Sequence, residues 1–388
     1  MRFSTGVDYW PQRTSLAMWR RFDAGEIAED FARIAALGID AVRVFALWDD
    51  FQPQPDAAAP EMLDHLAALA NAAHDAGVQV VPVLFCGELA RNIRLPPWAR
   101  SARGVRDLFT GSLLEAQLVL ARAAGARLRE HPALRAWDIG HEFTRLWQPS
   151  RTRARTGDHT PQLLSESTVA EWSRRLTDTL KSASSIGTTA GVFAADLTED
   201  HGVRLGSLCA PFAFASIQAR GPDLTFARNR LDPEAVPFLA MLTAAFTHQA
   251  VAVTAFGHVT CRPDTFSTDH PCLSEDENAR FCTAVLERLH ADGRLGASWW
   301  CWADAAHDDV AFALAPHEGA YGLIRADGSE KPVAAAIAAF ARRGLQVVAA
   351  ADMPVISADY YYRTLPSSTA TLYQAYLAFV AERRNELG

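Results

Sequence analysis

One glutamate, Glu142, follows a predicted strand at a position suited to a catalytic acid or base. Residues 137–140 have the apolar character of a buried strand, and His141 and Glu142 follow them directly. A carboxylate at the end of a strand is held in a defined position, and partial burial can tune its affinity for a proton. A solvated carboxylate in a loop is the alternative. Because the strand directs Glu142 into a fixed site, we predict that it transfers protons.

Polar residues also close other apolar runs of the chain. Asp8, Arg43 and Gln218 each end, or lie within, a β-branched segment. An unpaired charge inside such a segment is strongly disfavoured, so Arg43 should have a carboxylate partner in the site. Asp8 and Gln218 suit either substrate contact or the anchoring of a loop.

Tryptophans gather near the same strand ends, at Trp10, Trp48, Trp299 and Trp302. An indole offers a large apolar face and a polar edge, which suits the apolar faces of sugar rings. Side chains alternate along a strand. We therefore expect Trp299 to be a stacking platform and Trp300 to pack under the helices.

These residues need a scaffold, which the alternation of short apolar runs and longer amphipathic segments supplies. Eight runs have strand character: 3–9, 41–47, 78–85, 136–140, 190–195, 212–218, 251–256 and 297–302. Six segments have helical character: 26–37, 61–76, 113–130, 169–182, 275–290 and 332–342. This pattern predicts an α/β fold, a (β/α)8 TIM barrel. A doubly wound open sheet is the alternative, but no GxGxxG follows the first strand.

The barrel is expected to span residues 1–345 as the catalytic domain. Residues 346–388 are expected to form a short C-terminal extension packed on the barrel. Active sites of such barrels lie at the carboxyl ends of the strands, where the residues singled out above fall.

Several segments resemble one group of enzymes. The stretch WDIGHEF at 137–143 is similar to the W-x-x-x-N-E-P motif of clan A glycoside hydrolases, and TAFG at 254–257 to their T-E-F-G motif. GIDAVRVF at 38–45, SWWCW at 298–302, and YGL with DGSEKP at 321–332 resemble the second strand, the strand-eight tryptophan and the closing segment of family 5. The start GVDYWP at 6–11 also resembles family 42 β-galactosidases.

The resemblance implies a retaining β-glycosidase that hydrolyses a small glycoside or oligosaccharide by double displacement. Glu142 matches the acid/base, and Ala255 occupies the position of the nucleophilic glutamate. His141 stands where the family has an asparagine that binds the sugar 2-hydroxyl. Arg43 and the indoles would bind substrate. Because His141 replaces that asparagine, the resemblance leaves open which sugar occupies the −1 subsite and whether its ring is a pyranose or a furanose.

A methyl group cannot attack an anomeric carbon, so the chain should be inactive or severely impaired. Thr254, Phe256 and Gly257 keep the motif around Ala255, which favours an engineered replacement of the nucleophile. A natural sugar-binding pseudoglycosidase is the alternative. A further possibility is that Asp304 or Glu88 supplies the missing carboxylate.

Composition and charge argue against several classes of partner and of cellular location. The formal net charge of −8 and the absence of a basic stripe argue against nucleic acid as a partner. No apolar run suits a membrane span, and no signal peptide is recognisable, so a cytoplasmic protein with carbohydrate as its partner is predicted. The six cysteines show no CxxC pairing, although Cys261 and Cys272 could form a bridge in an exported protein. No cofactor is implied, and scattered histidines such as His74 and His258 predict no metal site.

Overall fold

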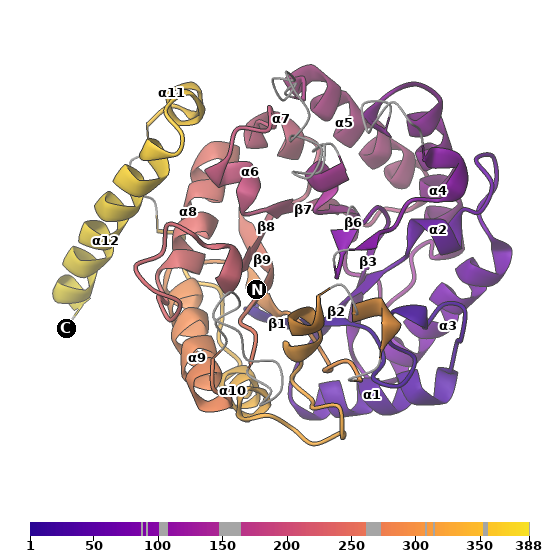
Figure 1. Ribbon diagram of the computed structural model, residues 1–388, viewed down its shortest axis with the longest axis horizontal. Helices are drawn as coiled ribbons and strands as arrows, with labels where there is room; N and C mark the ends of the chain where they lie inside the picture. Colours follow the sequence, from indigo (N-terminus) through magenta and orange to yellow (C-terminus); the bar gives the residue numbers. More distant parts are fainter. Residues whose placement is uncertain are drawn as a thin grey trace.

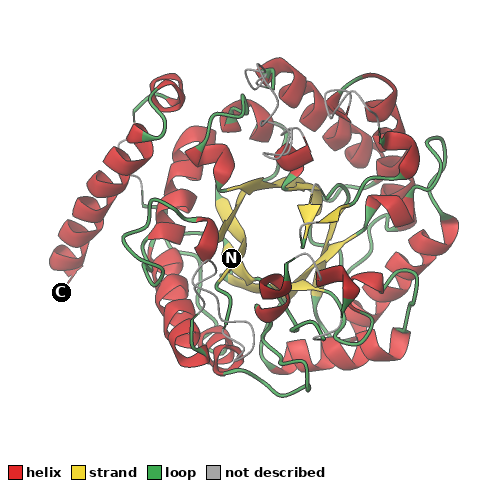
Figure 2. Cartoon of the chain, viewed as in Figure 1, coloured by secondary structure: helices red, strands yellow, loops and turns green. Residues whose placement is uncertain are grey.

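A closed barrel of eight parallel strands forms the centre of the protein, with helices around it (Figures 1 and 2). The computed structural model describes residues 1–86, 88–90, 92–100, 108–146, 164–260, 273–306, 309–312, 315–351 and 356–387. Around the barrel the strands follow the order β1-β10-β9-β8-β7-β6-β3-β2. Their bounds are β1 (Ser4–Tyr9), β2 (Ala41–Phe45), β3 (Gln79–Val83), β6 (Trp137–His141), β7 (Thr188–Phe193), β8 (Ala215–Arg220), β9 (Val251–Gly257) and β10 (Gly296–Trp299). Each predicted strand overlaps one of these, so the predicted TIM barrel is confirmed.

Most of the helices cover the outside of the barrel. They are α1 (Ala24–Ala36), α2 (Trp48–Phe51), α3 (Pro60–Asp75), α4 (Gly111–Arg127), α5 (Glu166–Ala183), α6 (Ala195–Thr198), α7 (Leu205–Cys209), α8 (Ala235–Thr247), α9 (Glu275–Ala291), α10 (Pro332–Ala341), α11 (Ala358–Arg363) and α12 (Ser367–Leu387). A two-stranded antiparallel sheet, β4 (Glu88–Leu89) and β5 (Asn92–Ile93), follows β3. All six predicted helices are present, with ends that differ by a few residues.

Local sequence explains several helix ends. A capping box formed by Ser274 and Glu277 begins α9, and the Asp23 side chain accepts hydrogen bonds from the first turn of α1. Gly38 and Gly77 follow α1 and α3 with φ values of 78° and 74°, a region that favours glycine. These turns direct the chain into β2 and β3, and so fix where those strands enter the barrel.

The sequence did not predict α8, because its residues are apolar on nearly every side and show no helical periodicity. The structure supplies the reason. Helix α12 lies against α8, and the Phe238 ring is 5.0 Å from that of Tyr373 and 5.5 Å from that of Tyr376, between centroids. Figure 1 shows α11 and α12 beside the ring of helices, next to α8. In addition, the Tyr361 hydroxyl in α11 donates to the Leu197 carbonyl of α6 at 2.6 Å.

Two further findings bear on the sequence predictions. Among the described residues, no helix combines the length and apolar character that a membrane span needs. Cys209, Cys282 and Cys301 are free thiols and are buried, and Cys86 is buried as well. The possible Cys261–Cys272 bridge lies outside the described residues.

Candidate active site

Glu142 directly follows β6 in a conformation that is unusual for a residue with a side chain. Its φ is 47°, in the left-handed region, and the residue is 3% exposed. Such backbone geometry costs free energy and is often found at functional sites. The Nη2 of Arg220 donates to Oε1 of Glu142 at 3.1 Å, and His141 Nε2 lies 3.9 Å from the same oxygen.

Arg220, the last residue of β8, connects Glu142 to two other carboxylates. Its Nη1 donates to Glu318 at 3.0 Å and its Nε to Asp223 at 3.2 Å. Burial lowers the pKa of Arg220, but the carboxylates of Glu318, Asp223 and Glu142 together hold it well above its usual value. The guanidinium therefore stays charged inside the site. The predicted strand ended at Gln218, so Arg220 was missed, although it lies on the same face two residues later.

Arg43 forms a second buried charge cluster inside the barrel. Its Nε donates to Asp138 at 2.8 Å and its Nη1 to Asp8 at 2.9 Å, so the expected carboxylate partner is present twice. Burial raises the pKa of Asp8 to about 7, although Arg43 opposes the shift. Burial likewise raises the pKa of Asp138. Arg43 Nη1 also lies 3.1 Å from His141 Nδ1.

The contact with Arg43 fixes the tautomer of His141. A guanidinium can only donate, so His141 Nδ1 must accept and the imidazole is neutral with its proton on Nε2. That proton is carried on the ring edge nearest Glu142. Arg43 and Glu142 are thus connected through one imidazole.

Trp300, rather than Trp299, faces this cluster. Its indole stacks on His141 with ring centroids 5.5 Å apart and planes at 8°, and the Arg220 guanidinium lies 5.2 Å from the centre of the indole. Trp299 instead donates from Nε1 to the Tyr321 carbonyl at 2.9 Å and packs edge-on against Phe256. The orientation of the two tryptophans is therefore the opposite of the predicted one: Trp300 faces the cluster and Trp299 packs in the wall. The two side chains do point to opposite faces of the strand, but the sequence-based prediction assigned the inner face to the wrong one.

The other three predicted indoles divide between the site and the barrel wall. Trp10 lies 5.3 Å from Trp300 between ring centroids, so it belongs to the cluster. Trp48 donates to Gln52 at 2.7 Å and packs on Phe85, while Trp302 lies under Arg33 of α1. Trp48 and Trp302 are thus wall residues, and the prediction that they bind substrate is not supported by their contacts.

Ala255 is fully buried and pairs in register with Gln218 of the neighbouring strand, beside a β-bulge. Gln218 Nε2 donates to the Gly191 carbonyl at 3.1 Å. A Cβ added to Gly191 would lie 2.1 Å from Gln218 Nε2 and 2.7 Å from Arg43 Nη2. Gln218 and Arg43 therefore meet over Gly191 inside the barrel, and Ala255 lies on the strand next to Gln218.

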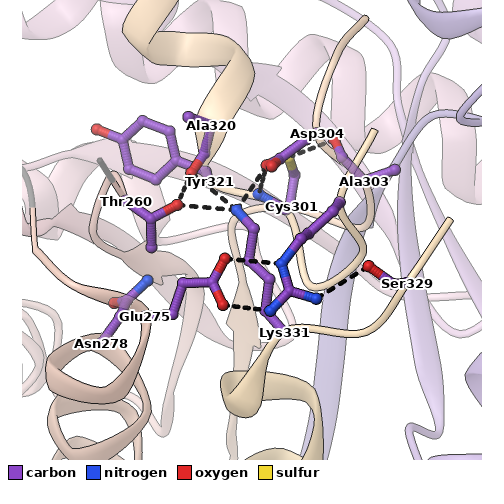
Figure 3. Close-up of polar contacts among 12 residues, drawn as sticks. Thr260, Glu275, Asn278, Cys301, Ala303, Asp304, Ala320, Tyr321, Ser329 and Lys331 are labelled. Carbon is purple, nitrogen blue, oxygen red and sulfur yellow. Dashed lines mark hydrogen bonds and ion pairs between the residues drawn. The ribbon is translucent and has the colours of Figure 1, made fainter. Parts of the chain in front are cut away.

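The carboxylate of Asp304, one of the two alternatives, is bound by a lysine and a backbone N–H. Asp304 Oδ1 accepts from Lys331 Nζ at 2.8 Å and from the Gly322 N–H at 2.8 Å (Figure 3). Glu88 lies in β4, and its side chain is outside the described part. Among the described residues, no group of three or more His, Cys, Asp or Glu side chains could hold a metal ion.

Several solved structures share this fold at low sequence identity. The GH5_18 protein of Streptomyces cattleya in complex with GlcNAc is 23% identical, with a TM-score of 0.83 over 98% of this chain and 92% of that one. A glutamate-to-alanine GH5_18 variant from the same organism, in complex with Manβ1-4GlcNAc, gives 22%, 0.83 and the same coverage. The exo-β-1,4-mannosidase Op5Man5 of an Opitutaceae bacterium, strain TAV5, gives 23% and 0.74 over 88% of this chain and 60% of that one.

No family model and no curated protein matches the sequence. At these identities the structural likeness establishes the fold. The chain thus has the barrel fold of the GH5 structures, as its sequence motifs led us to expect.

Proposed function

We propose that this chain is a glycoside hydrolase of the retaining β type in which alanine replaces the nucleophile. The observation that carries the proposal is the environment of Glu142. A buried carboxylate in a left-handed conformation follows a barrel strand, beside a neutral imidazole, a guanidinium and an indole face. The shared fold and the ordered sequence motifs support the same assignment.

In this mechanism Glu142 is the acid/base. It gives its proton to the glycosidic oxygen as the bond to the anomeric carbon breaks, while a carboxylate at position 255 attacks that carbon and forms a glycosyl ester. Glu142 then takes a proton from water, whose oxygen attacks the anomeric carbon and releases the carboxylate. Ala255 has no lone pair for the first attack, so substrate binding would remain and turnover would stop.

We propose a short β-linked oligosaccharide as the substrate, with Manβ1-4GlcNAc as the first candidate. This ligand is bound by one of the structural neighbours, and GlcNAc by another. In this chain Trp300 and Trp10 lie together beside His141 and Arg220, and they are the indoles that we propose for contact with a sugar ring. His141 Nε2–H could donate to a ring hydroxyl.

A natural sugar-binding protein without catalysis is the second candidate. The ion pair between Arg220 and Glu142 favours it, because a nearby cation stabilises the carboxylate and a general acid must carry a proton. A binding site tolerates an ionised Glu142, since it transfers no proton.

The test is to restore the missing carboxylate. We expect Ala255→Glu to hydrolyse one or more members of a nitrophenyl β-glycoside panel, and Glu142→Gln in the same background to abolish most of that activity. Azide or formate added to the unaltered chain should also give slow turnover of an activated glycoside by entering the space left at Ala255.

The outcomes separate the two candidates. A folded Ala255→Glu variant that binds Manβ1-4GlcNAc without turning over any glycoside would favour the binding protein. If neither form binds any of the sugars, both candidates are wrong.

A further inference from the structure

A buried lysine lies behind the segment that carries Glu318. Lys331 is 2% exposed, and its ammonium donates to three acceptors: Asp304 Oδ1 at 2.8 Å, Thr260 Oγ1 at 2.9 Å and the Ala320 carbonyl at 3.2 Å (Figure 3). Its three donors are therefore all used. The motif that contains Lys331 has no part in the proposed chemistry, so its burial calls for another explanation.

Lys331 and Asp304 together hold both sides of one residue, Tyr321. The Ala320 carbonyl before it also accepts from the N–H and the hydroxyl of Thr260, at 3.1 and 2.8 Å. The Gly322 N–H after it donates to Asp304. A Cβ on Gly322 would lie 2.2 Å from the Asp304 nitrogen, so this approach requires glycine. The Lys331–Asp304 ion pair, together with Thr260, therefore holds the backbone on both sides of Tyr321.

The same backbone segment carries Glu318, a residue that contacts the candidate site. Glu318 lies two residues before Ala320, on the short helix η8 (Pro316–Ala320). Its carboxylate accepts from Arg220 Nη1, while Nη2 of the same guanidinium donates to Glu142. The position of Glu318 therefore affects how Arg220 is shared.

We propose that Lys331 and Asp304 are a positioning pair that holds Glu318 against Arg220 and so divides the guanidinium between Glu318 and Glu142. This inference rests on the proposed role of Glu142 as acid/base. If Glu318 moves away, Arg220 interacts more fully with Glu142 and stabilises its carboxylate. The pair would thus keep Glu142 able to take up the proton that a general acid needs.

Other charges near Glu142 must be accounted for in any test. His141 Nε2 lies 3.9 Å from its carboxylate, and Asp223 shares Arg220 with it. His317 lies 3.8 Å from Glu318, and Tyr321 is close enough to interact electrostatically with Arg220. The test variants should leave these four groups in place.

The key variant is the double substitution Lys331→Met with Asp304→Asn. It removes one positive and one negative charge, so its direct electrostatic effect on Glu142 is small, and it leaves no unpaired buried charge. Glu318→Gln is the direct comparison. We expect both variants to lower the pKa of Glu142, by about one pH unit for Glu318→Gln and in the same direction for the double variant.

The measurement is a titration of full-length protein labelled with ¹³C at the glutamate side-chain carboxyl, with the Glu142 signal assigned from Glu142→Gln. Glu275→Gln is the matched control, because Glu275 pairs with Arg325 in the same closing segment but bonds neither Ala320 nor Gly322. We expect it to leave the pKa of Glu142 unchanged.

The proposal is overturned if the folded double variant keeps the native pKa of Glu142, if Glu318→Gln does so, or if Glu275→Gln lowers that pKa as much as the double variant. The titration needs no turnover, so it can succeed or fail independently of the glycosidase assignment. In the Ala255→Glu background, the alkaline limb of kcat/KM should move to lower pH in the same variants.

Discussion

Asp8 provides a sharp test of the buried charge cluster at Arg43. The residue is fully buried, Oδ1 accepts from Arg43, and Oδ2 has no hydrogen-bond partner among the described residues. Burial outweighs the attraction of Arg43 and raises the pKa of Asp8 to about 7. Ionised Asp8 should therefore destabilise the fold, even beside an arginine.

The sign and size of the effect follow from proton linkage. The pKa of Asp8 is higher in the folded than in the unfolded state, so between about pH 4 and 7 the folded protein holds a proton that the unfolded chain has lost, and stability falls as pH rises. A shift of roughly three pH units corresponds to about 4 kcal/mol. Asparagine resembles the protonated acid in shape and does not titrate. We expect Asp8→Asn to match the native free energy of unfolding near pH 4 and to exceed it by up to about 4 kcal/mol at pH 8.

The assay is urea unfolding followed by tryptophan fluorescence between pH 4 and pH 8. Asp56→Asn, at an exposed position, controls for the loss of one negative charge. If Asp8→Asn is less stable than the native chain at pH 8, the attraction of Arg43 exceeds the cost of burial, and the reasoning is wrong.

Three further predictions concern packing and charge. Trp300→Ala should weaken binding of Manβ1-4GlcNAc by about 2 kcal/mol, which is roughly a 30-fold increase in Kd measured by calorimetry. Trp299→Ala should mainly lower the free energy of unfolding, by about 3 kcal/mol or more. An equal loss of binding in both variants would contradict the assignment of the two indoles. Gly191→Ala should destabilise the protein by about 1–3 kcal/mol in denaturant titrations, because its Cβ would meet Gln218 and Arg43; unchanged stability would show that these side chains move aside. Desolvation raises the pKa of Asp232, but hydrogen bonds from Arg228 and Tyr373 outweigh it and lower that pKa to about 2. The ionised carboxylate therefore stabilises the fold above about pH 4, and this stabilisation is lost as pH falls toward 2. Asp232→Asn should be less stable than the native chain at pH 7 and should approach it in acid, and a stability difference independent of pH would contradict this.

Much of the fold follows from the sequence because the barrel strands are short apolar runs separated by amphipathic helices. Helix α8 escaped prediction because α12 covers the side that would otherwise face water, and such a tertiary contact leaves no periodicity to detect. The sequence marks the ends of the strands less clearly than their apolar centres. The predicted stop at Gln218 excluded Arg220, which the structure shows to be the direct partner of Glu142.

Only part of the candidate site was predicted, because local sequence patterns do not record long-range contacts. Local patterns located Glu142, His141 and Arg43, because each lies in or just after an apolar strand. They could not decide which of two adjacent tryptophans points inward, since alternation gives a period without a phase. Nor could they find Glu318 or Lys331, whose importance arises from contacts with residues far away in the sequence.

Whether a carboxylate at position 255 attacks the anomeric carbon is best tested by covalent trapping. The Ala255→Glu variant would be incubated with a 2-deoxy-2-fluoro β-glycoside that has an activated leaving group, digested, and analysed by mass spectrometry. We predict one glycosyl adduct on the peptide that contains position 255. A folded variant that hydrolyses glycosides but carries the label on another carboxylate, such as Asp8, or that is never labelled, would contradict it.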